Sequence, residues 1–67
     1  MTTMIEIVQN LQTSCDEILG QNELVVHSSV SCSDCIDVYT SNGTYACTID
    51  SEEAQYEGIV LDLGNYI

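Results

Sequence analysis

Four cysteines and a single histidine are the residues with the most evident chemistry in this sequence of 67 residues. Cys32 and Cys35 form a CxxC pair, which in redox enzymes stands at the start of a helix within a βαβ unit. Here the pair opens a strand-like alternating run, and no Lys or Arg is present to activate a thiolate. The sequence therefore argues against a thioredoxin-like redox enzyme.

Zinc is the second chemistry that these residues offer, because thiolates and imidazole nitrogens are its usual ligands. Structural zinc sites usually contain two close ligand pairs, whereas this chain has one pair plus Cys15 and Cys47. Those two residues occupy positions that suit small buried side chains. Plain thiols are the favoured state, while zinc and a disulfide involving Cys32 or Cys35 stay open, and we expect no resident cofactor.

Catalysis by paired carboxylates, as in glycoside hydrolases, requires a substantial cleft. A short chain without Trp or Phe has little material to build one. His27 is the only histidine, and the sequence pattern indicates neither a nucleophile nor an orienting acid beside it. We therefore expect a protein that is not an enzyme.

Charge is the most informative property, since eleven acids stand against no Lys and no Arg, for a formal net charge of −11. DNA-binding proteins gain much of their affinity from Lys and Arg that replace counterions at phosphates. We therefore expect a basic partner and no nucleic acid. No apolar run approaches the roughly 20 residues of a membrane span, and the N-terminus lacks the positive region of a signal peptide. These features predict a cytoplasmic protein without membrane contact.

The elements that must position these residues begin with an N-terminal helix. Thr3 and Glu6 have the spacing of a capping box, and Gly20 is a natural end. Apolar residues recur at alternating spacings of four and three, which predicts one buried stripe. The stripe consists of Met4, Val8, Leu11, Cys15 and Ile18, with Ile5 and Leu19 widening it.

Segment 23–30 alternates in the manner of a strand, and two further alternating runs flank Asn42-Gly43, the preferred pair of a two-residue type I′ hairpin turn. The first strand should turn Leu24, Val26 and Val30 to one face, and Glu23, Val25 and His27 to the other. With Ser41 opposite Thr44, the pairs Val38 with Cys47 and Ile36 with Ile49 face the helix, while Tyr39 with Ala46 and Asp37 with Thr48 face outward.

The C-terminal third is acidic at first and then apolar. Segment 51–57 is either an acidic connection or a single helical turn, which Gly58 ends. Ile59, Leu61 and Leu63 alternate, which predicts a last strand. We therefore predict one compact acidic domain over 1–67 of the α+β class, with one N-terminal helix packed on a three- or four-stranded antiparallel sheet that contains a 35–50 hairpin.

The acids on this fold are the candidate contact residues. Asp37 and Asp50 are diagonal neighbours on the outer sheet face, about 7–8 Å apart, which resembles the separation of successive phosphates. Tyr39 on that face is a candidate anchor, while Tyr45 is assigned to the core. The first cluster consists of Asp34, Asp37, Asp50, Glu52, Glu53 and Glu57, and a second, at the helix end, of Asp16, Glu17 and Glu23.

In size, charge and layout, though not in any sequence motif, the chain resembles small acidic inhibitors made by bacteriophages and other mobile elements, including anti-CRISPR proteins and anti-restriction DNA mimics. The resemblance implies a protein that acts in the host bacterial cytoplasm to evade host defence, and we expect a monomer or weak dimer. Such an inhibitor occupies the DNA-binding surface of a CRISPR effector, which we favour, or of a related DNA-processing enzyme. It needs neither catalysis nor a cofactor.

Two other interpretations stay open. An acidic adaptor or antitoxin-like module would bind a basic protein that is not a nucleic-acid enzyme, and would not compete with DNA. A small zinc-stabilised structural protein would bind stoichiometric metal and lose its fold with a chelator.

Overall fold

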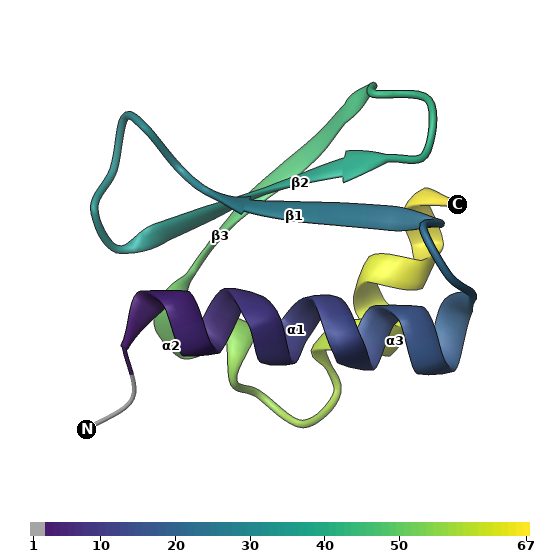
Figure 1. The fold of residues 1–67 in the computed structure, drawn as a ribbon, viewed down its shortest axis with the longest axis horizontal. Coiled ribbons are helices and arrows are strands. Elements are labelled where there is room, and N and C mark those ends of the chain that lie inside the picture. The colour runs from purple at the N-terminus through teal and green to yellow at the C-terminus, as the bar shows by residue number, and fades with distance from the viewer. Residues whose placement is uncertain (1–2) are drawn as a thin grey trace.

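The computed structural model describes residues 3–67 and shows a three-stranded antiparallel sheet with one long helix packed across its inner face (Figure 1). The strands lie in the order β1-β2-β3, which confirms the predicted α+β fold with three strands among the described residues. The elements in chain order are α1 (Met4–Leu19), β1 (Leu24–Ser28), β2 (Cys35–Thr40), β3 (Tyr45–Asp50), α2 (Ser51–Ala54), α3 (Ile59–Leu63) and the 3₁₀ turn η1 (Gly64–Tyr66).

Helix α1 begins at the predicted cap, because Thr3 Oγ1 accepts a hydrogen bond from the backbone N–H of Glu6 at 3.2 Å. Its buried line differs in part from the predicted stripe. Ile7, which the stripe omitted, is buried together with Leu11 and Cys15. Ile5 and Ile18 are 68% and 58% exposed, so their assignment to the core was wrong. Ile5 lies off the buried line, and Ile18 lines an open groove beside the helix.

Strand β1 confirms the predicted inward residues Leu24 and Val26 but ends at Ser28, before Val30. The Ser29 N–H donates to Cys35 O at 2.9 Å and closes the pairing with β2. The chain then turns away, which leaves Val30 fully exposed and makes its inward assignment wrong.

The hairpin between β2 and β3 has a three-residue loop rather than the predicted two-residue turn. The Thr40 N–H donates to Thr44 O at 2.9 Å, and Gly43 takes a positive φ of 86°. This is the geometry of a type I turn followed by a left-handed residue. Thr44 therefore lies opposite Thr40, and the predicted pairing of Ser41 with Thr44 was wrong.

A bulge in β3 then restores the predicted register. Tyr39 pairs with Tyr45, not with Ala46, and the register shifts by one residue before Val38. The confirmed pairs beyond the shift are Val38 with Cys47, Asp37 with Thr48 and Ile36 with Ile49. The longer loop and the bulge cancel, so the inward face of the hairpin is the predicted one.

The predicted last strand was wrong, because residues Ile59–Leu63 form helix α3. Ile59, Val60 and Leu63 are buried, whereas Leu61 is 70% exposed. Buried residues at i, i+1 and i+4 follow helical periodicity, which a five-residue segment does not distinguish from alternation. Of the two alternatives for segment 51–57, the helical turn is present as α2.

The core fills the space between α1 and the inner sheet face, and α2 and α3 close its remaining side (Figure 1). No polar or charged side chain is buried within residues 3–67. None of the helices in that range has the length and apolar character needed to cross a membrane. The buried residues are Ile7, Leu11, Cys15, Leu24, Val26, Ile36, Val38, Ile49, Ala54, Ile59, Val60 and Leu63.

The side chain of Gln12 ties the free edge of β1 to α1. Its Nε2 donates to Leu24 O at 2.8 Å, and its Oε1 accepts from the Val26 N–H at 3.0 Å. The amide therefore takes the place that a neighbouring backbone would occupy in a wider sheet. An edge strand with unpaired backbone groups is prone to pair with other chains, and Gln12 covers part of this edge.

Candidate partner-binding surface

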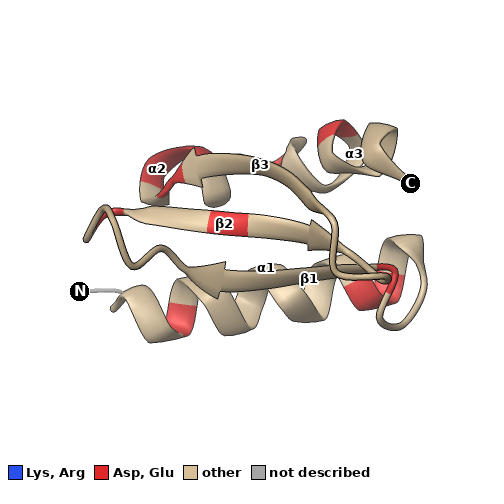
Figure 2. Ribbon diagram, turned by 90° about the horizontal axis from the view of Figure 1, so that it is seen from above, with Lys and Arg blue, Asp and Glu red and all other residues tan. Residues whose placement is uncertain are grey.

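The outer face of the sheet lies opposite α1, and no helix covers it among the described residues (Figure 2). Alternation places Val25 and His27 of β1 on this face, together with Cys35, Asp37 and Tyr39 of β2. Tyr45, Thr48 and Asp50 of β3 complete it. The result is an open surface of aromatic, hydroxyl and carboxylate groups on rigid strands.

A chain of hydrogen bonds crosses this face from β3 to β2. Thr48 Oγ1 donates to Asp37 Oδ1 at 2.7 Å, and the Tyr45 hydroxyl lies 2.6 Å from Thr48 Oγ1. Because the single Thr48 hydroxyl proton is given to Asp37, the Tyr45 hydroxyl donates to Thr48. The carboxylate of Asp37 is therefore held in place by Thr48, which is held in turn by Tyr45.

Three rings form a ladder across the same face. Tyr39 contacts His27 edge to face with ring centres 5.8 Å apart, and it contacts Tyr45 in the same way at 5.9 Å. Tyr39 thus lies on the outer face as predicted. Tyr45 is 56% exposed, so its assignment to the core was wrong. The bulge at Ala46 keeps Tyr45 opposite Tyr39 instead of turning it inward.

Four acids of the first cluster gather where β3 runs into α2. Asp50 is the N-cap of α2 and accepts from the Glu53 N–H at 2.7 Å. Asp34 accepts from the Ser51 hydroxyl at 2.6 Å, which ties the β1–β2 loop to the same turn. Glu52 and Glu53 in the first turn of α2 are exposed. Asp34 and Asp50 therefore build the fold, while Glu52 and Glu53 extend into solvent.

Asp37 and Asp50 are diagonal neighbours in the observed register, as the sequence predicts. Each of them, however, already accepts a hydrogen bond within the chain. Glu57 does not continue their row, because it lines a groove beside α1 instead of the outer face. The sequence could not place Glu57, since the path of segment 51–57 was undecided.

The second cluster lies at the other end of the molecule from α2 (Figure 2). The longest dimension of the molecule is 29 Å. Asp16 accepts from Gln12 Nε2 at 3.0 Å and from the Asn22 N–H at 3.1 Å, which fixes the connection from α1 to β1. Glu17 is exposed and Glu23 is half-buried. The structure therefore separates the two predicted clusters instead of joining them into one surface.

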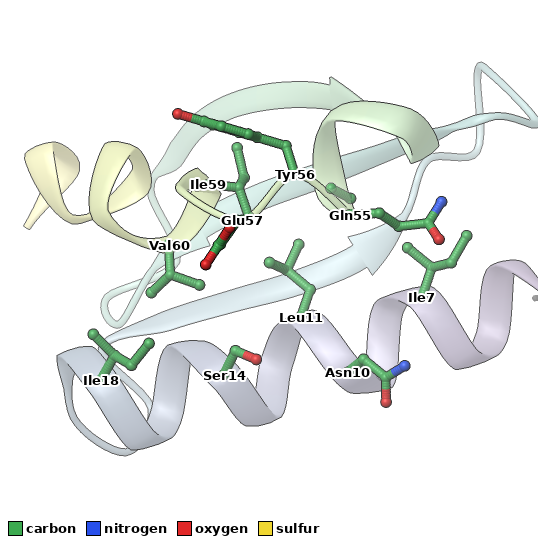
Figure 3. Close-up of a pocket in the computed structure, with 11 residues that line it drawn as sticks. Ile7, Asn10, Leu11, Ser14, Ile18, Gln55, Tyr56, Glu57, Ile59 and Val60 are labelled. Carbon is green, nitrogen blue, oxygen red and sulfur yellow. The ribbon is translucent and has the colours of Figure 1, made fainter.

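A groove between α1 and the segment from Gln55 to Val60 is a feature that sequence reasoning missed (Figure 3). It has a volume of about 380 Å³, with an apolar floor that includes Ile7 and Leu11. Ile18 and Tyr56, at 58% and 54% exposure, form part of its rim. Sequence reasoning missed this groove because it assigned residues 59–63 to a strand, whereas Ile59 and Val60 line the side of the groove opposite α1.

Cys32 and Cys35 form a disulfide, so the prediction of plain thiols was wrong for this pair. Their Cα atoms are 5.3 Å apart, within the range that a disulfide bridges, because the chain turns between them. Within residues 3–67 no three or more His, Cys, Asp and Glu residues gather as metal ligands.

Cys15 and Cys47 are free thiols. Burial raises the pKa of the Cys15 thiol, and the charge of Asp16 raises it further. Burial also raises the pKa of Cys47, with a hydrogen bond to Tyr66 opposing and the charge of Glu53 adding. Both thiols are therefore in the protonated, less nucleophilic form at neutral pH.

Compared with known proteins, the chain matches no family model, no curated protein sequence and no solved structure. The candidate function therefore depends on the charge and geometry of the chain itself.

Proposed function

We propose that this protein is an inhibitor that presents a DNA-like negative surface and blocks DNA binding by a CRISPR effector, as an anti-CRISPR protein does, or by a related DNA-processing enzyme. The supporting observation is eleven carboxylates with no Lys or Arg, none of them buried within residues 3–67. The charge is therefore turned outward and has no internal cation to neutralise it. A protein site built for phosphates attracts such a surface.

The end of the molecule around α2 is the contact surface that the geometry supports best. Glu52 and Glu53 are adjacent, exposed and held on a capped turn next to the Asp34 and Asp50 carboxylates. Carboxylates accept paired hydrogen bonds from arginine, the residue that clamps phosphates and contacts guanine. The capped turn already holds the backbone of these two residues in place, so binding orders only their side chains, which favours occupancy of a DNA site.

The place of action under this proposal is the cytoplasm of the bacterial host, where such effectors work, with the protein encoded by a phage. Inhibition is by occupancy and requires no catalysis and no cofactor. Bacterial cytoplasm keeps thiols reduced, so the contact surface must function without the Cys32–Cys35 disulfide.

A charge-matched pair of variants tests the proposal. Glu52→Lys with Glu53→Lys changes the net charge from −11 by +4 to −7, and Glu17→Lys with Asp62→Lys does the same at other exposed sites. Asp37 and Asp50 are unsuitable because both make hydrogen bonds that support the fold. In gel-shift competition with a panel of CRISPR effectors and restriction enzymes, the α2 variant should lose inhibition and the control should keep it.

Salt and the fate of the DNA complete the test. Inhibition by the unmodified protein should be stoichiometric and should weaken as salt rises, because exposed charges are screened beyond about 8 Å at physiological ionic strength. Equal loss in both variants would show that only total charge matters. Stable binding to a complex that still takes up DNA would refute mimicry.

That last outcome would favour the acidic adaptor, for which the groove along α1 is the specific observation. A charge mimic does not require a groove with an apolar floor, whereas an adaptor uses one to hold a segment of its partner. Replacing Ile18 with Ser at the exposed rim of the groove separates the two functions. Binding should weaken for an adaptor and stay unchanged for a mimic that binds through α2.

A further inference from the structure

The outer sheet face holds a second feature that the charge of α2 does not explain. A hollow of about 610 Å³ lies over β1 and β2, and Asp37, Tyr39 and His27 line it together with the apolar side chains of Val25 and Val30. Thr40, Ser41 and Gly43 bound it on the side of the hairpin loop. A carboxylate, aromatic rings and aliphatic walls thus meet in one open cavity.

We propose that this hollow binds an arginine side chain of the partner, an inference that rests on the proposed function in requiring a basic partner and deepens it by naming the residue recognised. The guanidinium group is planar, always charged and weakly hydrated, so it stacks on aromatic rings and donates to carboxylates at once. Its methylene stem packs on aliphatic groups. The hollow offers all three kinds of contact: the ring of Tyr39 for stacking, the carboxylate of Asp37 as acceptor, and Val25 and Val30 for the stem.

The carboxylate of Asp37 is prepared for such a ligand. Its Oδ1 is held by Thr48, which is in turn fixed by Tyr45 on the β3 side. The structure shows no hydrogen bond to Oδ2 within residues 3–67, which leaves that oxygen able to accept from a guanidinium. The chain contains no Lys or Arg that would neutralise Asp37 internally. The orientation of the acceptor is therefore set before binding, and no Lys or Arg of the chain itself competes for it.

Arginine fits the hollow better than the two ligands nearest to it in chemistry. A lysine ammonium is strongly hydrated and has no flat surface to stack on Tyr39. The base of a nucleotide would stack on Tyr39, but the phosphate of the nucleotide would be repelled by a chain of net charge −11. The site is distinct from the exposed pair Glu52 and Glu53, so one partner can contact both.

The test uses the free protein and needs no target. A blocked Gly-Arg-Gly peptide and its Gly-Lys-Gly counterpart are titrated into ¹⁵N-labelled protein at low salt, and amide shifts are followed. The arginine peptide should shift the amides around His27, Asp37 and Tyr39 and bind several-fold more tightly than the lysine peptide. Asp37→Asn, which still accepts from Thr48, should weaken binding about tenfold, since one charged hydrogen bond is lost.

Matched variants decide between a site and simple attraction. Asp62→Asn lowers the charge equally on an exposed position of α3 and should leave binding unchanged. Tyr39→Phe should retain binding, while Tyr39→Leu should weaken it, because only the first keeps the ring. Equal affinity for the two peptides, or an affinity for the arginine peptide that is unchanged in Asp37→Asn, would overturn the arginine site. Failure of the DNA competition would overturn the inhibitor proposal alone, because the titration contains no target.

Discussion

Replacing Gln12 with alanine should destabilise the fold out of proportion to the size of the change. The substitution removes no buried apolar side chain, but it removes both hydrogen bonds that tie the edge of β1 to α1. Leu24 O and the Val26 N–H lose their partners at the margin of the core, where Leu24 and Val26 are themselves buried. The Gln12 bond to Asp16 is lost as well.

The magnitude follows from those two backbone groups. Each hydrogen bond contributes about 0.5–1.5 kcal/mol net, and leaving a buried group unpaired costs about 1–3 kcal/mol. We expect a loss of about 2 kcal/mol, because water reaches an edge strand and replaces part of the pairing. A domain of this length has a total stability of about 3–10 kcal/mol, so the variant loses a substantial share of it.

Urea unfolding followed by circular dichroism measures the loss, with Gln9→Ala as the control on an exposed position of the same helix. The control should be neutral or slightly more stable, since alanine favours helix. Hydrogen exchange supplies the local readout, because the Val26 amide should lose protection in Gln12→Ala. If the two variants agree within about 0.5 kcal/mol and Val26 stays protected, packing alone holds this edge and the reasoning is refuted.

Two further results follow from the cysteines. The raised pKa of Cys15, which starts from an ordinary value of 9.0, means that the unfolded chain ionises first, so the free energy of unfolding should fall as pH rises above about 9. Urea unfolding at pH 8 to 10.5 should show a smaller fall in Cys15→Ala, and an identical fall would exclude this thiol as a cause. Reducing the Cys32–Cys35 disulfide, which closes a short loop, should cost about 2 kcal/mol in the chain-entropy model. A Cys32→Ser, Cys35→Ser variant should be insensitive to reductant, and DNA competition by the reduced protein should be unchanged.

The hairpin shows how far local sequence signals determine the fold. Alternation set the inward faces of β2 and β3, and the pairs Val38 with Cys47 and Ile36 with Ile49 were predictable. The turn type was not predictable, because Asn42-Gly43 is compatible with a two-residue loop and also with a three-residue loop. The observed loop is the three-residue form, in which only Gly43 has a positive φ. The compensating bulge at Ala46 depends on strand twist and on contacts between strands, which no short segment encodes.

The candidate site was less predictable than the fold. Outward acids such as Asp37, Glu52 and Glu53 followed from alternation and position in the chain, but their hydrogen-bond partners did not. Tyr45 was assigned inward because the shifted register was unknown, and the groove was missed because a segment as short as 59–63 fits two periodicities. Tertiary contacts decided these cases, since burial of Ile59, Val60 and Leu63 requires α1 alongside.

Charge determines which partner can cover the apolar groups that this fold leaves exposed. Ile18, Tyr45 and Leu61 are each more than half exposed, and contact with another protein would remove their apolar surface from water. A second copy would bring another net charge of −11 to the contact, and neither copy has a Lys or Arg to offset the repulsion. A basic surface gains from the apolar contact and from the opposite charge together. Under the proposed function, the absence of cations therefore has a second effect besides attraction to a DNA-binding site, because it disfavours dimers of this chain that would cover the same surface.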